Sequence, residues 1–279
     1  MIDAAKVEQH YGQASLIERL RDALKADGLD DRTLHPEDLA PLDQFHSRGL
    51  QATVELAQAL NIGDATNVID IGSGLGGPSR YLAATYRCNV CGIDLSEAYV
   101  DAASFLAERT GLADRVDYTR ANALSLPFEA ASFDIAWTQH VAMNVADRAT
   151  LYREAHRVLR PGGRFAIYDV VAASGEPLHY PVPWAATPET SFLVTADRMQ
   201  SLLLEQNFEI VSWTDCTEAA INWFAEVQKA RAARSGTPAL ALGLQVVMGP
   251  GFGEMTKNLA RNLREGRAGL IQAIVAKPR

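Results

Sequence analysis

VIDIGSGLGG, residues 68–77, is the stretch that decides the fold. It reads as a buried apolar strand, a carboxylate and a run of glycines, and a second carboxylate, Asp94, ends the next apolar segment. Glycines let a backbone turn sharply and approach a ligand closely, and a carboxylate roughly 20 residues later can accept both ribose hydroxyls. The stretch therefore predicts a nucleoside-binding turn between a strand and a helix. It satisfies both GxGxxG and DxGxGxG, so by itself it leaves the nucleoside open.

Four further blocks follow the glycine run in a fixed order. They are two short apolar strands at residues 90–96 and 116–123, FDIAW at 133–137, and RVLRPGGRF at 157–165. Together with the glycine run they span residues 64–172 and resemble the class I S-adenosylmethionine-dependent methyltransferases. The layout resembles the small-molecule subgroup that includes the sarcosine/dimethylglycine methyltransferases and, more distantly, the ubiquinone-pathway methyltransferases.

The resemblance implies an α/β fold in one methyltransferase domain covering residues 1–279. We expect a Rossmann-like, seven-stranded, mostly parallel sheet with an antiparallel last strand near 266–275 and helices on both faces. Residues 1–63 are predicted to form a helical lid, 64–172 the cofactor-binding core, and 173–279 the acceptor-site cap and C-terminal strands. Within the lid, a helix is expected to begin at Pro41 with Asp43 as its N-cap.

Composition narrows the class of partner. The net charge is −8 and the pI about 5.3, which disfavours a duplex nucleic-acid surface because such a surface needs clustered Lys and Arg. No stretch of 18 apolar residues is present, and the N-terminus lacks an apolar signal core. We expect a soluble cytoplasmic protein with a small-molecule acceptor and no nucleic-acid or membrane partner. A homo-oligomer is compatible with the sequence, which carries no signal for or against one.

The cofactor residues follow from the resemblance and from their chemistry. S-adenosyl-L-methionine would lie against the bare backbone of the glycine run, with Asp70 near its amino group and Asp94 on its ribose. Leu95 would cover one adenine face, and position 122 would bind the adenine edge, where the family has an acid and this chain has Asn122. The full predicted set is Asp70, Gly72, Ser73, Gly74, Asp94, Leu95, Asn122, Ala123 and Gln139.

The catalytic prediction rests on two neighbouring strand ends. His140 follows the fourth strand and Asp169 ends the fifth, so an imidazole and a carboxylate would face one crevice, the acid orienting the base. This pair favours O-methylation with His140 as general base. The alternative reading of His140 is a contact with the sulfonium edge or a cap for the next helix. The predicted acceptor-site residues are Tyr11, Gln44, His46, Asn144, Trp184 and Phe192.

Other classes of function remain open from the residues alone. N- or C-methylation by proximity and desolvation is the alternative within the family, a non-catalytic nucleoside-binding module is another, and an NAD-dependent dehydrogenase is a third. Cys88 and Cys91 form a CxxC, but residues three apart on a strand point to opposite faces, and no second cysteine pair completes a zinc site. No metal is expected.

Overall fold

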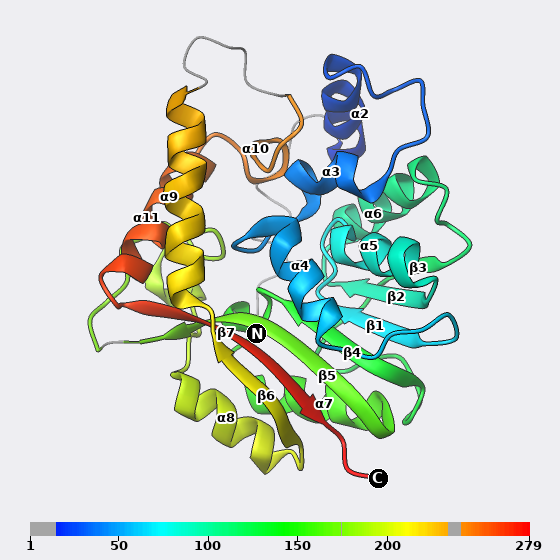
Figure 1. The fold of residues 1–279 in the computed structure, drawn as a ribbon, viewed down its shortest axis with the longest axis vertical. Coiled ribbons are helices and arrows are strands. Elements are labelled where there is room, and N and C mark those ends of the chain that lie inside the picture. The colour runs from blue at the N-terminus through cyan, green and yellow to red at the C-terminus, as the bar shows by residue number, and fades with distance from the viewer. Residues whose placement is uncertain (1–14, 174, 234–240) are drawn as a thin grey trace.

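The computed structural model describes residues 15–173, 175–233 and 241–279. These residues fold around a seven-stranded sheet in the order β3-β2-β1-β4-β5-β7-β6 (Figure 1). The strands are β1 (Asn67–Ile71), β2 (Asn89–Asp94), β3 (Val116–Arg120), β4 (Phe133–Gln139), β5 (Leu159–Ala172), β6 (Glu209–Asp215) and β7 (Ala268–Ala276). Strands β1 to β5 pair in parallel, whereas β7 runs antiparallel between β5 and β6. The predicted fold class is confirmed.

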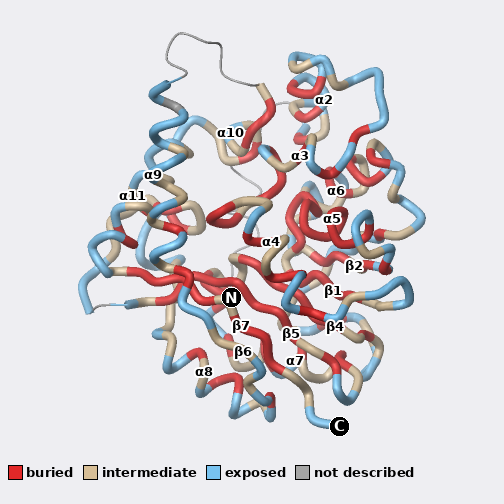
Figure 2. Tube along the Cα trace, viewed as in Figure 1, coloured by how far each residue is buried: buried red, intermediate tan, exposed pale blue. Residues whose placement is uncertain are grey.

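Helices cover both faces of the sheet. The described helices are α2 (Leu16–Ala26), α3 (Pro36–Asp43), α4 (Gly49–Gln58), α5 (Gly77–Tyr86), α6 (Glu97–Arg109), α7 (Arg148–Val158), α8 (Ala196–Glu205), α9 (Thr217–Ala233), α10 (Gln245–Met248) and α11 (Phe252–Arg264). One buried cluster joins the sheet to α4, α5, α9 and α11, and a second joins it to α7 and α8. Buried residues accordingly concentrate along the strands (Figure 2).

A third apolar cluster lies away from the sheet. It joins α2 and α3 to α6 and α10, through residues such as Leu20, Leu39, Leu106 and Val247. Helices α2 and α3 thus pack beside the helices of the glycine-run half rather than on the strands themselves (Figure 1). Residues 43–48, the last residue of α3 and the connection to α4, are consequently held near the carboxyl ends of the central strands.

The glycine run turns the chain from β1 into α5. Gly72 has a φ of +78° and Gly74 a φ of +53°, backbone conformations that L side chains adopt with strain. The backbone amides of Gly72 and Ser73 both donate to the carbonyl of Ile93, at 2.8 and 2.9 Å, which ties the loop to the end of β2. A Cβ at position 72 would also collide with Val141. Glycine is therefore required here both by conformation and by space.

Two local expectations are corrected. Pro41 lies inside α3, which ends at Asp43, and the next helix begins at Gly49, so Asp43 caps no helix start. Its carboxylate instead pairs with Arg80, as described below. The RVLRPGGRF block spans a helix end, a turn and a strand by its sequence, but the structure places RPGG within the long strand β5, as an irregularity in its pairing with β4. Gly162, at φ +79°, accommodates that irregularity, and its amide bonds to the carbonyl of Lys277.

Candidate functional site

Two predicted cofactor carboxylates stand at the ends of adjacent strands. Asp94 ends β2, and its Oδ2 accepts from the Gly74 amide at 3.0 Å while its Oδ1 accepts from the Ser96 amide at 2.9 Å. Burial raises the pKa of Asp94, and these backbone hydrogen bonds oppose that rise. The carboxylate is therefore fixed against the glycine run, and its remaining lone pairs can accept from hydroxyl groups.

Asp70 lies on β1, one strand further along. Its side chain is buried, and its Oδ2 accepts from the Ser79 hydroxyl at 2.6 Å. Burial raises the pKa of Asp70 to about 7, although the hydrogen bond from Ser79 acts in the opposite direction. A buried carboxyl with this pKa favours a cationic neighbour, because a nearby positive charge stabilises the ionised form.

A small cavity lies between the glycine run and residues 43–48. Its lining residues come from the end of α3 and the segment after it, from the glycine run and the start of α5, and from the end of β4: Asp43, Phe45, His46, Asp70, Gly72, Ser73, Pro78 and Gln139. Its volume is about 20 Å³, enough for one water molecule. Small-molecule sites commonly measure about 300–1,000 Å³. The cavity as it stands is therefore smaller than a nucleoside, and the Phe45 ring, which packs on Gly74, is one of the side chains that fill the space above the glycine run.

A buried ion pair anchors this segment to α5. The Nη2 of Arg80 donates to Asp43 Oδ2 at 2.6 Å, and both side chains are almost fully buried. The Nη1 of Arg80 donates to the carbonyl of Leu75 in the glycine run, at 2.7 Å. Burial raises the pKa of Asp43 to about 6, against the lowering effect of the guanidinium. One arginine thus connects the end of α3 to the nucleoside-binding loop.

Several polar side chains meet where α4 lies over β4. The Thr53 hydroxyl lies 2.8 Å from Gln44 Oε1 and 3.1 Å from both His46 Nε2 and Gln139 Oε1. Trp137 Nε1 donates to the same Gln139 oxygen at 3.0 Å. The structure therefore brings together Gln44, His46 and Gln139, which the sequence had placed in two separate binding sites.

His140 turns its side chain into this group. Strict alternation after Gln139 would send the next side chain to the α7 face, but His140 has a φ of +54°, which breaks the alternation. Its amide donates to the Tyr168 carbonyl at 2.8 Å, and its ring stacks on the Tyr168 ring with centroids 5.5 Å apart. The His46 ring lies edge-on at 6.1 Å. A strained backbone held by such contacts is common at active sites.

Both imidazoles are neutral at physiological pH. Burial lowers the pKa of His140 well below its usual range, with the neighbouring His46 acting in the same direction. Burial also lowers the pKa of His46 to about 4. Among the described residues, His140 Nε2 has no hydrogen-bond partner. A neutral imidazole with a free ring nitrogen can accept a proton.

The structure does not bring His140 and Asp169 together. Tyr168 belongs to the apolar cluster under α4, and the next residue on the strand, Asp169, points to the opposite face of the sheet. Its carboxylate accepts from the amides of Ala142 and Val170, both at 3.1 Å. The predicted imidazole–carboxylate pair is therefore corrected. Asp169 lies on the other face of the sheet and accepts from the turn after β4, whereas His140 has Tyr168 and His46 as neighbours.

The predicted acceptor-site wall is fixed to the turn after β4. Asn144, in the short 3-10 helix η1 (Ala142–Asn144), donates through Nδ2 to the Trp184 carbonyl at 2.7 Å. The amide of Phe192 donates to the carbonyl of Met143 at 2.8 Å. Asn144, Trp184 and Phe192 thus belong to one loop assembly that begins two residues after His140. Tyr11 lies outside the described residues.

The adenine-side predictions are placed at the β2 and β3 ends of the sheet. Leu95 follows Asp94 and is 42% exposed, so its side chain is accessible to a ligand. Asn122 accepts through Oδ1 from the Leu124 amide at 2.9 Å, an Asx-type turn with Ala123 between them. Asn122 therefore forms a turn with its side-chain oxygen, which leaves its amide nitrogen for a ligand.

Sequence reasoning missed the residues that support this site. Thr53, Trp137 and Tyr168 follow the apolar periodicity of a helix and two strands, so they read as core. Asp43 and Arg80 are 37 positions apart, and no local pattern connects them. The one available signal was the presence of charged residues inside otherwise apolar helix faces.

The residues present fit S-adenosylmethionine. Gly72 and Gly74 provide a backbone cradle, Asp94 provides acceptors at one end, and buried Asp70 provides a partner for a cation one strand away. Ser73 Oγ and Gln139 Nε2 are buried without a partner among the described residues. Each needs a ligand group, because an unpaired buried polar atom is costly.

Comparison with known proteins identifies the class. Residues 69–167 match the family model described as a methyltransferase domain. With the fold and the site above, this match makes the core of the chain a class I S-adenosylmethionine-dependent methyltransferase domain, and S-adenosyl-L-methionine is its cofactor. The match favours the methyltransferase interpretation over the dehydrogenase alternative.

Individual relatives carry several chemistries. The chain is 35% identical to methyltransferase GfsG from Streptomyces halstedii, over 48% of each chain. It is 31% identical to O-methyltransferase resE from Aspergillus sclerotiorum, over 58% of this chain and 62% of that one. It is 27% identical to a sarcosine/dimethylglycine N-methyltransferase from Halorhodospira halochloris, over 73% of this chain and 72% of that one. The chain thus spans about half to three-quarters of the length of these relatives.

Solved structures agree on the fold. The [4+2]-cyclase SpnF superposes with a TM-score of 0.65 at 22% identity, covering 95% of this chain and 96% of that one.

Within the described part of the chain, no helix is long and apolar enough to cross a bilayer. Cys88 and Cys91 fall in different apolar clusters on the two sides of the sheet, as their spacing predicted.

Proposed function

We propose that this chain transfers the methyl group of S-adenosylmethionine to a hydroxyl of a small-molecule acceptor, with His140 as general base. The observation that carries the proposal is the neutral His140 imidazole, whose Nε2 is free among the described residues and which directly follows the cavity-lining residue Gln139. When bound, S-adenosylmethionine supplies an electrophilic methyl group. The protein then has to orient the acceptor, exclude water and take up the hydroxyl proton.

The chain's own residues are suited to these tasks. His140 Nε2 would accept the proton of the hydroxyl, and stacking on Tyr168 would keep the ring in place. Residues 43–48 would close the site, because Phe45 and His46 line the cavity above the glycine run. The loop carrying Trp184, bonded to Asn144, would form the acceptor side. The relative named as an O-methyltransferase supports this chemistry.

N-methylation is the second candidate, and the N-methyltransferase relative covering 72% of its own length favours it. An amine that reaches the site unprotonated needs no strong base, so proximity and desolvation would suffice. C-methylation by the same means is the third. The presence of a [4+2]-cyclase among proteins of this fold means that the fold alone does not establish methyl transfer.

The test is transfer of isotope-labelled methyl from S-adenosylmethionine to a metabolite extract, with mass analysis of every product. Once the acceptor is known, His140→Gln should lower kcat about 100-fold or more while the affinity for S-adenosylhomocysteine, measured by calorimetry, stays within about threefold. Wild-type turnover in this variant would refute the general base. Binding of the cofactor with no labelled product in any extract would refute methyl transfer itself.

A further inference from the structure

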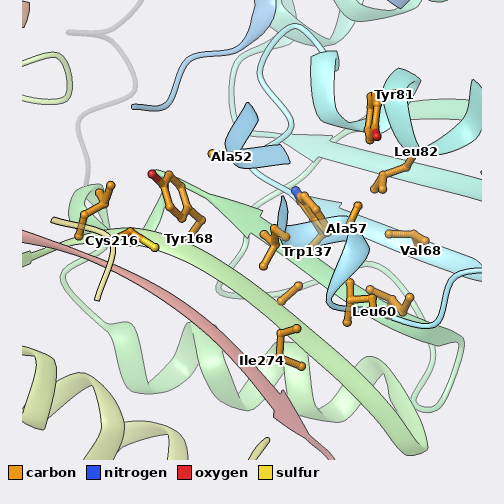
Figure 3. Close-up of a cluster of buried hydrophobic side chains, with 14 of the residues drawn as sticks. Ala52, Ala57, Leu60, Val68, Tyr81, Leu82, Trp137, Tyr168, Cys216 and Ile274 are labelled. Carbon is orange, nitrogen blue, oxygen red and sulfur yellow. The ribbon is translucent and has the colours of Figure 1, made fainter. Parts of the chain in front are cut away.

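The amide of Gln139 is locked in one orientation. Its oxygen lies 3.0 Å from Trp137 Nε1 and 3.1 Å from the Thr53 hydroxyl. An indole nitrogen is only ever a donor, so the amide atom facing Trp137 is the oxygen and the flipped assignment is excluded. Trp137 and Thr53 are both fully buried, and the indole is packed in the apolar cluster between β4 and α4 (Figure 3).

With its oxygen held by Trp137, Gln139 presents its amide nitrogen as a donor. Gln139 is 8% exposed, and within the described residues its Nε2 has no partner. The side chain lines the cavity that also contains Asp70, Gly72 and Ser73. Because a buried N–H without an acceptor costs about 1–3 kcal/mol, this arrangement indicates that a ligand oxygen binds here.

The order of the strands indicates which oxygen. Asp94, Asp70 and Gln139 stand on β2, β1 and β4, three consecutive strands of the sheet. A ligand with its ribose on Asp94 extends its amino-acid end toward β1 and β4. Asp70 attracts the ammonium of that end and repels its carboxylate, whereas the Gln139 donor attracts the carboxylate. Ser73 Oγ, buried and likewise unpartnered in the described chain, can donate to the same group.

We infer that Gln139 binds the carboxylate of the methionine part of S-adenosylmethionine, and that Trp137 is a positioning residue that keeps the Gln139 donor directed at it. The inference rests on the proposed function for its ligand. It predicts that the site distinguishes the amino-acid form of the ligand from a form that has the ammonium but lacks the carboxylate.

Calorimetry at pH 8.5 with two ligands tests this. The first is S-adenosylhomocysteine, and the second is its decarboxylated analogue, 5′-deoxy-5′-(3-aminopropylthio)adenosine. Gln139→Glu keeps the oxygen that accepts from Trp137 but replaces the donor with an acceptor. We expect this variant to bind S-adenosylhomocysteine about 30-fold or more weakly and the analogue as tightly as wild type or more tightly, since hydrogen bonds to charged groups are the strong ones. An equal loss for both ligands would overturn the carboxylate assignment.

The positioning role of Trp137 needs its own comparison. Trp137→Phe should weaken S-adenosylhomocysteine about 3- to 10-fold in the wild-type background, with no further loss in the Gln139→Glu background, because the donor it positions is gone. Trp213→Phe, on β6, is the matched control and should bind as wild type. A loss of the same size in both backgrounds would show a merely structural effect and overturn the positioning role. Circular dichroism checks that each variant is folded. If Trp137→Phe does not fold, Trp137→Leu takes its place in the same comparison.

The two proposals fail in different ways. If wild-type protein bound neither ligand, the proposed function would fall and this inference with it. If wild type bound S-adenosylhomocysteine and the Gln139→Glu loss did not depend on the carboxylate, only this inference would fall.

Discussion

Replacing Asp43 by Asn should lower the free energy of unfolding by about 3–5 kcal/mol. Arg80 Nη2 and Asp43 Oδ2 are 2.6 Å apart, and the Asp43 and Arg80 side chains are 1% and 0% exposed. Water therefore cannot solvate the guanidinium once the carboxylate is removed. Removing one partner of a buried ion pair leaves an uncompensated charge, and the quoted range is the usual cost. It is a large share of the roughly 5–15 kcal/mol that stabilises a typical protein.

Urea unfolding followed by tryptophan fluorescence measures this quantity. Arg80→Met combined with Asp43→Asn should be less destabilised than the sum of the two single variants, since no unpaired charge remains. The matched control is Arg32→Met. Arg32 pairs at 2.8 Å with Asp38, which lies on α3 as Asp43 does, but Arg32 is 48% exposed, and its loss should cost under about 1 kcal/mol. A loss below about 1 kcal/mol for Asp43→Asn would refute the argument that this pair anchors the segment over the glycine run.

Three further predictions concern single side chains. Burial lowers the pKa of His46 to about 4 from an unfolded value near 6.5, so its contribution to stability is complete above pH 6.5 and is lost as pH falls toward 4. Going from pH 7 to pH 5, wild type should therefore lose about 2 kcal/mol more than His46→Asn, and parallel urea curves at the two pH values would contradict the shifted pKa. Asp169→Asn should lower the melting temperature, because Oδ2 accepts from the Ala142 amide, without moving the pH dependence of kcat; a shifted pH profile would restore the His140–Asp169 pair. Asp94→Ala should weaken S-adenosylhomocysteine about 10- to 100-fold by calorimetry, and unchanged affinity would remove its ribose role.

Much of the fold was predictable from local sequence. The apolar strands, the glycines that demand positive φ and the carboxylates at strand ends are short-range signals, and they predicted the strand–turn–helix unit around residues 68–77 and the positions of Asp70 and Asp94, while the seven-stranded sheet was implied by the family resemblance. Parallel strands of this connectivity leave few alternative topologies. The helix boundaries around Asp43 were mispredicted, because a local N-cap signal competed with a partner 37 residues away.

The candidate catalytic site was only partly predictable. The sequence identified His140 as a residue at the carboxyl end of β4, but not the direction of its side chain, which depends on one backbone angle. Period-two alternation would have placed it on the face of Asp169, whereas the positive φ turned it toward Tyr168 and His46. Likewise, Gln139 was named as a cofactor residue, but the second donor to its amide oxygen, Thr53, comes from α4 and depends on how α4 packs over β4.

The sequence by itself determined that a glycine-lined turn between a strand and a helix, with acids at positions 70 and 94, would form a nucleoside site, because those requirements act over a few consecutive residues. Only the tertiary structure decided which side chains meet above it. Burial set the pKa values of Asp70, His46 and His140, and long-range packing joined Asp43 to Arg80 and Thr53 to Gln139. Both effects depend on how far a group is removed from water and on which residues distant in the sequence surround it, and neither can be inferred from the residues adjacent to it in the chain.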